Sequence, residues 1–213
     1  MKNDCVAIVL AGGEGKRFWP IETSKSMFPF CGLPLLVHNL NRLKKTGLTD
    51  VIIVIHPQDK NIFDHLRVGG LTIRTVIQPT PNGMAGAVLS AAPLLKNTSC
   101  FIMNAEDLVD EMLYEQLSMN IGGNHIALVG RKVIKYFPTG YYVLKGTNVV
   151  GVVEKPGEGN EPSDLAKVVF DYFPDSNRFV ELLRTTKSEQ DDVYEKALNE
   201  LLKDGKAKIL PYD

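Results

Sequence analysis

Short apolar runs alternate with segments of helical periodicity along the first ~120 residues, and this alternation constrains the fold more than any other feature. The runs are rich in β-branched or aromatic residues, as strands buried on both faces are. We predict strands at residues 5–10, 51–55, 71–77 and 101–104. We predict helices at residues 35–45, 60–67, 85–95 and 110–118. Such alternation indicates an α/β fold with a doubly wound, mostly parallel, Rossmann-like sheet.

The second part of the sequence has a different pattern. It predicts three strands joined by hairpin-like links at residues 126–129, 140–144 and 149–153. Two helices follow at residues 175–184 and 190–203, and a last strand at residues 207–210. We therefore expect this half to be mixed and rich in β-structure. The stretch 157–162 indicates a surface loop rather than a linker. We treat residues 1–213 as a single domain with two halves, 1–120 and 121–213.

Charge and composition exclude several classes of protein. The 24 Lys and Arg residues nearly balance 25 Asp and Glu residues, a net charge of −1, which argues against non-specific binding to nucleic acid. No apolar run approaches the ~18–20 residues of a membrane-spanning helix, and the N-terminus lacks a signal-peptide pattern. The three cysteines, Cys5, Cys31 and Cys100, fit neither a disulfide framework nor a metal cluster. We expect a cytoplasmic protein that binds neither nucleic acid nor a membrane.

A glycine-rich loop follows the first predicted strand directly. Gly12, Gly13 and Gly15 leave backbone N–H groups unobstructed, and two cations, Lys16 and Arg17, follow them. Such a loop can fold around phosphate oxygens. It has neither the ending of a Walker A loop nor the spacing of a dinucleotide-binding fingerprint. The alternative is a tight turn that needs glycine only for its geometry.

Further motifs follow the loop in a fixed order. They are Lys25 before Met27-Phe28-Pro29, Gln78 with Gly83 and Ala85, Asp107 after the fourth strand, and Glu154-Lys155-Pro156 after a later strand. With this order the chain resembles the sugar-phosphate nucleotidyltransferases, or NDP-sugar pyrophosphorylases. These include mannose-1-phosphate guanylyltransferases and glucose-1-phosphate uridylyl- and thymidylyltransferases. The resemblance extends from about residue 5 to residue 156, and more weakly to the end.

The resemblance implies a reaction and its partners. A nucleoside triphosphate and a sugar 1-phosphate would give an NDP-sugar and pyrophosphate, by Mg²⁺-dependent in-line attack on the α-phosphate. The sugar phosphate oxygen is itself a nucleophile, so no serine, cysteine or general base is required. The fold would be of the GT-A/nucleotidyltransferase type, with residues 1–120 as the nucleotide-binding half and 121–213 as the sugar-binding half.

The resemblance also assigns residues to the nucleotide. The nucleotide-binding positions would be Leu10, Ala11, Gly12, Gly13, Gly15, Gln78 and Gly83. The catalytic positions would be Arg17, on the β- and γ-phosphates, and Lys25, on the α-phosphate. The alternative for Lys25 is a solvated lysine in a loop. The alternative for Gly83 is a turn glycine at the start of a helix.

The metal and the sugar phosphate have their own candidates. Asp107 lies at the carboxyl end of a predicted parallel strand, where ligands bind in such sheets, so it is the implied Mg²⁺ ligand. Its alternative role is to cap the next helix. Gly140, Glu154 and Lys155 would bind the sugar 1-phosphate, although a strand end of this composition is also common on protein surfaces.

Two departures from the family pattern leave alternatives open. The gap from Arg17 to Lys25 is short, as in cytidylyltransferases that act on alcohol phosphates. The second metal-binding carboxylate of the family is expected at about the point where the chain ends, so we expect a C-terminally truncated half. Asp171, in a strand-like segment, does not match the family pattern. A nucleotide- or sugar-phosphate-binding relative without turnover is therefore the other alternative. The base, the sugar and the oligomeric state stay open, and a homo-oligomer is compatible with the sequence.

Overall fold

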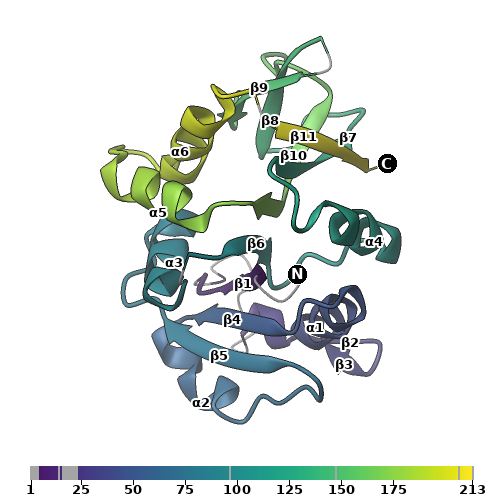
Figure 1. Ribbon diagram of the computed structural model, residues 1–213, viewed down its shortest axis with the longest axis vertical. Helices are drawn as coiled ribbons and strands as arrows, with labels where there is room; N and C mark the ends of the chain where they lie inside the picture. Colours follow the sequence, from purple (N-terminus) through teal and green to yellow (C-terminus); the bar gives the residue numbers. More distant parts are fainter. Residues whose placement is uncertain are drawn as a thin grey trace.

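Four parallel strands form the centre of the first half (Figure 1). The structure, a computed structural model, describes residues 5–13, 15, 24–95, 97–146, 148–205 and 207–212. β1 pairs with β4 on one side and with β6 on the other, and β5 lies beyond β4. The bounds are β1 (Cys5–Ala11), β4 (Asp50–Ile55), β5 (Thr72–Ile77) and β6 (Ser99–Asn104). The four strands predicted in the first half are confirmed.

The second half continues the same sheet with mixed pairing. β10 runs antiparallel to β6 and to β7, while β11 runs parallel to β7. β8 and β9 form a hairpin that joins the sheet through β8 and β10. The bounds are β7 (Ile126–Lys132), β8 (Gly140–Lys145), β9 (Asn148–Glu154), β10 (Leu165–Phe173) and β11 (Ala207–Tyr212). The mixed, β-rich half is confirmed, but the predicted link between β7 and β8 is wrong because β10 is the neighbour of both.

Helices cover both faces of this sheet, which confirms the doubly wound α/β fold. In Figure 1, α3, α5 and α6 lie on one side and α1 and α4 on the other. On β1, Val6, Ile8 and Leu10 pack on the α3 side, whereas Ala7 and Val9 pack on the α1 side. The bounds are α1 (Leu35–Thr46), α2 (Lys60–Phe63), α3 (Gly83–Ala91), α4 (Glu111–Asn120), α5 (Ser176–Thr185) and α6 (Val193–Leu202).

Local sequence signals fix several helix ends. α1 buries Leu36, Leu40 and Leu43 on one face and ends at Gly47, whose φ of 86° is left-handed and favours glycine. The side chain of Asp110 accepts a hydrogen bond from the backbone N–H of Met112 and caps α4. The remaining short elements are η3 (Lys25–Met27), η4 (Pro57–Asp59), η5 (Ala92–Leu94), β2 (Pro29–Phe30) and β3 (Leu33–Pro34). Among the described residues, no helix is long and apolar enough to cross a membrane.

The strand order creates a crevice between β1 and β6. The chain proceeds from β1 to β4 and β5 on one side, and then returns to β6 on the other side of β1. At such a reversal, the loops that follow the two strands separate and leave space for a ligand beyond their carboxyl ends. The loop after β1 begins with Gly12 and Gly13, and the loop after β6 contains Ala105 and Glu106.

Candidate active site

A cleft of about 550 Å³ lies at the carboxyl ends of β1 and β6. Eight of the residues predicted to bind nucleotide or to act in catalysis line it, namely Leu10, Ala11, Gly12, Gly13, Gly15, Lys25, Gln78 and Gly83. They come from the loop after β1, the η3 turn and the β5–α3 segment, which are brought together only by the sheet. Arg17 lies outside the described residues.

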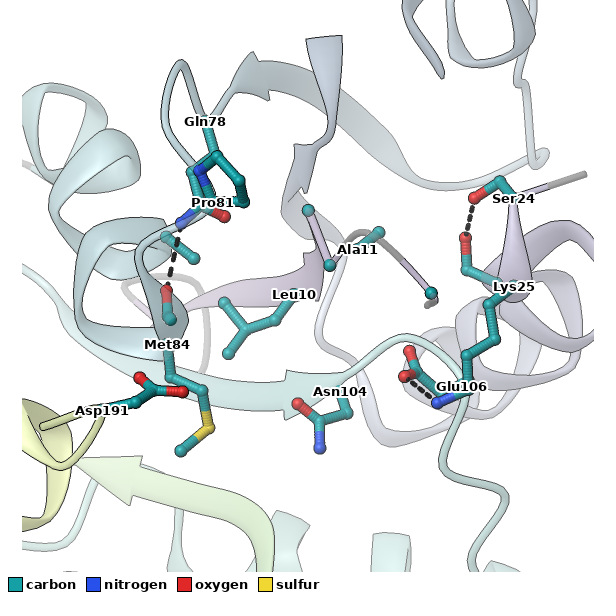
Figure 2. Close-up of a pocket in the computed structure, with 16 residues that line it drawn as sticks. Leu10, Ala11, Ser24, Lys25, Gln78, Pro81, Met84, Asn104, Glu106 and Asp191 are labelled. Carbon is teal, nitrogen blue, oxygen red and sulfur yellow. Dashed lines mark hydrogen bonds and ion pairs between the residues drawn. The ribbon is translucent and has the colours of Figure 1, made fainter. Parts of the chain in front are cut away.

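Lys25 forms an ion pair, at one end of the cleft, with a carboxylate that follows β6. Its Nζ atom lies 2.6 Å from Oε1 of Glu106 (Figure 2). The side chains are 41% and 23% exposed, so solvent screens the pair and its contribution to stability is at most ~1 kcal/mol. A pair of this strength can separate when an anionic ligand enters. The structure therefore places a cation and a carboxylate at the same end of the cleft.

Asp107, the predicted metal ligand, does not line this cleft. Its Oδ2 accepts a hydrogen bond of 2.8 Å from Nδ2 of Asn104, and its backbone oxygen accepts one from Asn39. The cleft-lining groups on this loop are Asn104 and Glu106. Asp107 does not cap α4 either, since Asp110 does. Asp107 thus orients Asn104, and Glu106 supplies the carboxylate that faces the cleft.

The Asn104–Glu106 loop suits Mg²⁺. This ion is usually held by one or two carboxylates together with substrate phosphates and water, and its ligands are oxygens. Glu106 offers carboxylate oxygens, and Asn104 has its amide nitrogen bonded to Asp107, which leaves its Oδ1 for another partner. No cluster of three metal-ligating side chains occurs within the described part of the chain. The loop therefore offers two oxygen-bearing side chains for a metal whose other ligands would come from elsewhere.

Gln78 shapes the end of the cleft opposite Lys25. The side chain is only 4% exposed. Its Nε2 donates hydrogen bonds of 3.1 Å to Oδ1 of Asn82 and to the backbone oxygen of Gly83. Its Oε1 faces Gly12 so closely that a Cβ atom at Gly12 would overlap it. Gln78 thus fixes the β5–α3 loop and requires glycine after β1.

Gly83 is constrained by its backbone and by a neighbour. Its φ is +80°, and a Cβ atom there would overlap Oδ1 of Asp191. Asp191 belongs to the segment before α6, about half the chain away, and also lines the cleft. Sequence reasoning missed Asp191, because no motif surrounds it and only the packing of α6 beside α3 brings it to this site.

The predicted sugar-phosphate residues form a second group outside this cleft lining. Gly140 lies opposite Glu154 in the β8–β9 hairpin, and a Cβ atom at Gly140 would be 3.1 Å from Oε2 of Glu154. Nζ of Lys155 lies 3.0 Å from Oε1 of Glu154. This hydrogen bond raises the pKa of Lys155, and the charge of Asp191 adds to the effect. Asp191 therefore lines the first cleft and also acts, through its charge, on Lys155 of the second group.

A buried polar network lies beside the second group. Nζ of Lys167 is 2.9 Å from Oδ2 of Asp171, and the Tyr194 hydroxyl donates a hydrogen bond of 2.8 Å to the same oxygen. Both charged side chains are almost completely buried. Burial raises the pKa of the neighbouring Glu195 to about 7, although the Lys167 charge opposes this rise. Sequence reasoning did not find this network, and Asp171, which matched no motif, is one of its members.

The family of the chain follows from comparison with known proteins. The family described as nucleotidyl transferase matches residues 6–210, which is nearly the whole chain. The chain belongs to the nucleotidyl transferase family. This confirms the resemblance inferred from the order of the motifs.

Several relatives of this chain are named as sugar-phosphate nucleotidyltransferases. A glucose-1-phosphate thymidylyltransferase of Neisseria gonorrhoeae is 27% identical over 190 residues, which cover 84% of this chain and 64% of the relative. A mannose-1-phosphate guanyltransferase 2 of Candida glabrata is 28% identical over 119 residues, covering 52% of this chain and 33% of the relative. The chain therefore spans less than two thirds of the length of these curated relatives.

Solved structures support the fold of this chain. A candidate glucose-1-phosphate thymidylyltransferase from Bacillus anthracis superposes with a TM-score of 0.83 at 20% identity, and the match covers 98% of this chain and 87% of that one. A UDP-glucose pyrophosphorylase from Acinetobacter baumanii gives a TM-score of 0.77 at 19% identity, covering 96% and 85%. At these identities the likeness establishes the fold.

Proposed function

We propose that this nucleotidyl transferase joins a nucleoside triphosphate to a sugar 1-phosphate. An oxygen of the sugar phosphate attacks the α-phosphorus, the bond from the α-phosphorus to the bridging oxygen breaks, and pyrophosphate leaves with that oxygen. The products are an NDP-sugar and pyrophosphate. The observation that carries the proposal is the convergence of the glycine loop, Lys25 and Gly83 on one cleft at the β1–β6 reversal.

The glycine loop is assigned to the triphosphate. Gly12 and Gly13 lack side chains beyond the carboxyl end of β1, so backbone N–H groups can approach phosphate oxygens closely. A Cβ atom at Gly13 would meet no other atom within 4 Å, so this residue leaves open space beside the loop. The loop therefore binds and orients the triphosphate, and Arg17 at its end is proposed to hold the β- and γ-phosphates.

Lys25 is assigned to the α-phosphate. In the structure its ammonium group pairs with the Glu106 carboxylate. When the triphosphate enters, we propose that the ammonium group moves to the α-phosphate oxygens, where negative charge increases in the transition state. A positioned cation that acts on developing charge lowers the barrier more than it improves substrate binding.

Glu106 and Asn104 are the residues proposed to hold Mg²⁺. When bound there, Mg²⁺ would offset the charge of the phosphates and favour departure of pyrophosphate. The release of Glu106 from Lys25 would make its carboxylate available at the same moment. Asp107 contributes indirectly, because its carboxylate keeps the Asn104 amide in one orientation.

The sugar 1-phosphate is assigned to the group formed by Gly140, Glu154 and Lys155. Glu154 can accept hydrogen bonds from sugar hydroxyls, and Lys155 can pair with the phosphate. Gly140 leaves space against Glu154 and Val152, where a side chain would be crowded. Binding here would bring the attacking oxygen toward the α-phosphorus.

Pyrophosphate release tests the proposed function. The purified chain is mixed with Mg²⁺, each nucleoside triphosphate in turn, and glucose 1-phosphate or mannose 1-phosphate. We expect pyrophosphate with at least one pair of substrates and none when the sugar phosphate is omitted. Absence of pyrophosphate with every pair, combined with measurable nucleotide binding, would instead identify a binding protein without turnover.

A further inference from the structure

The carboxylate of Asp191 is a polar group of the cleft that the proposed reaction leaves unused. Figure 2 shows it beside Met84, at the end of the cleft opposite Lys25 and Glu106. Asp191 is exposed, and no described residue donates a hydrogen bond to its side chain. Within the described part of the chain its oxygens therefore have no hydrogen-bond donor, and they can accept hydrogen bonds from a ligand.

The position of Asp191 assigns it to the base of the nucleotide. Lys25 and the glycine loop define the phosphate end of the cleft, and a nucleotide that lies along the cleft places its base farthest from the phosphates. Asp191 contacts Gly83, which is at this far end together with Gln78.

The side chains described around Asp191 offer no free hydrogen-bond donor. Both hydrogens of the Gln78 amide are used, one by Asn82 and the other by the Gly83 carbonyl. The Pro81 and Met84 side chains, which also line this end, carry no hydrogen-bond donor. An ionised carboxylate only accepts hydrogen bonds, so a base suited to this end must present donors toward Asp191.

We propose that Asp191 selects guanine, an inference that rests on the proposed function and specifies its nucleotide. Guanine carries a ring N1–H and a 2-amino group side by side, and these two donors match the two oxygens of a carboxylate. Uracil and thymine have a single ring N–H between two carbonyl oxygens, which a carboxylate repels. Adenine and cytosine place an unprotonated ring nitrogen beside their amino group. Guanine is thus the base whose edge satisfies both oxygens.

Gly83 makes this arrangement feasible. A side chain at position 83 would occupy the place of the Asp191 Oδ1 atom. With glycine there, the carboxylate lies directly against the start of α3 and reaches the base end of the cleft. The absence of a side chain at Gly83 is therefore what allows Asp191 to lie where it does.

Inosine triphosphate provides a sharp test because it lacks only the 2-amino group of guanine. Binding of GTP, ITP, dGTP and UTP is measured by calorimetry with the full chain and Mg²⁺, without sugar phosphate. We expect GTP to bind about 10- to 100-fold more tightly than ITP and UTP, as the loss of a hydrogen bond to a charged group predicts. In Asp191→Ala and Asp191→Asn this preference for GTP should fall to within about threefold.

Glu189→Gln is the matched control, since Glu189 is an exposed acid of the same segment that does not line the cleft. It should retain the preference for GTP. Equal binding of GTP and ITP by the unmodified chain, tighter binding of UTP, or an unchanged preference in Asp191→Ala would overturn the proposal. A loss in Asp191→Ala of discrimination against dGTP alone would also overturn it, because Asp191 would then contact the ribose.

The binding measurement separates this inference from the proposed function. If GTP is selected through Asp191 but no pyrophosphate appears with any sugar phosphate, the proposed reaction fails and the base assignment stands. If pyrophosphate appears equally well with UTP or dTTP, the reaction stands and the base assignment fails. Thermal unfolding of each variant confirms that a loss of selectivity does not come from loss of the fold.

Discussion

Gly83 illustrates how much of this site depends on single residues. Its backbone has a positive φ, and its missing side chain makes room for Asp191. Either constraint alone favours glycine, and together they exclude every other residue without a local shift. Gly83 could be predicted from its motif, but the packing reason for the glycine lies in a segment about 108 residues later.

Gly83→Ala is expected to weaken nucleotide binding by about tenfold or more and to lower the free energy of unfolding by about 1 kcal/mol. The new methyl group would displace the Asp191 carboxylate and strain the start of α3. Urea unfolding and nucleotide titration measure the two effects. Gly69→Ala is the control, because a Cβ atom at Gly69 meets nothing within 4 Å. A Gly83→Ala protein that binds nucleotide normally would contradict the assignment.

Lys25→Ala should lower kcat by about 100-fold or more while KM for the sugar phosphate changes by less than about threefold. The reason is that Lys25 acts on charge that develops at the α-phosphate. Lys45→Ala serves as the control, since Lys45 forms an exposed ion pair with Glu111 away from the cleft. Steady-state kinetics measure both variants. Equal changes in kcat and KM would mean that Lys25 only binds substrate.

Glu106 and Asp107 can be separated by their dependence on Mg²⁺. Glu106→Gln should raise the Mg²⁺ concentration needed for half-maximal turnover by about tenfold or more, because its carboxylate faces the cleft. Asp107→Asn should have a smaller effect, through the orientation of Asn104. Turnover as a function of Mg²⁺ concentration gives both values. The opposite ranking would restore Asp107 as the metal ligand.

At the scale of elements, β10 holds the two halves together. It pairs with β6 of the parallel sheet and with β7 and β8 of the mixed half. The ring of Phe170 packs edge-on against Phe101 and Tyr114, with centroid distances of 4.6 and 4.9 Å. β10 also carries Lys167 and Asp171, the buried ion pair. Because Lys167 lies beside Gly140, the packing of β10 supports the β8–β9 hairpin that carries Gly140 and Glu154.

Lys167→Met should destabilise the fold by about 3–5 kcal/mol. The substitution removes the cation from a buried ion pair. Among the described residues, only the Tyr194 hydroxyl would then donate a hydrogen bond to the buried Asp171 carboxylate. Denaturant unfolding measures the loss. Lys132→Met is the control, since Lys132 and Asp164 form an exposed pair whose expected contribution is at most ~1 kcal/mol. Similar losses in the two variants would show that burial of the pair has no special effect.

The pH dependence of stability should report on Glu195 of α6. Burial raises its pKa from 4.5 to about 7, with Glu154 and Asp171 adding to the rise and Lys167 opposing it. The folded state therefore binds the proton more tightly than the unfolded state. The stabilisation is full below pH 4.5 and is lost as the pH rises through 7.

Comparison with Glu195→Gln isolates this group, because glutamine stays neutral. Between pH 4 and pH 8 the unmodified chain should lose about 3 kcal/mol of unfolding free energy relative to the variant. Urea unfolding at several pH values measures the difference. A difference that does not change with pH would mean that the pKa of Glu195 is the same in the folded and unfolded states.

At the scale of the whole molecule, the parallel half could be predicted because each of its elements has a local signal. Strand β1 and most of β4 are continuous apolar runs, and α1 shows its apolar face and its terminal glycine. In the mixed half, the strands and helices could be predicted, but the order in which the strands pair could not. Strand order there depends on contacts between distant segments, such as Phe170 with Phe101, which a local pattern does not contain.

The same distinction explains the outcome at the cleft. Residues in motifs next to a strand end, such as Gly12 and Lys25, line the cleft, and their roles there stay predictions. Two adjacent acids after β6 could not be distinguished, since the turn after the strand decides which one faces the cleft. Asp191 could not be found at all, because it reaches the cleft only through the packing of α6 and α3.

Transfer of a labelled α-phosphate distinguishes nucleotidyl transfer from nucleotide binding alone. The full chain is incubated with Mg²⁺, a sugar 1-phosphate and a nucleoside triphosphate labelled at the α-phosphate, and the products are separated. The account predicts that the label moves into an NDP-sugar, with one pyrophosphate released for each NDP-sugar formed, and only when the sugar phosphate is present. Label that stays in the triphosphate, or that appears in a nucleotide without sugar, would contradict it.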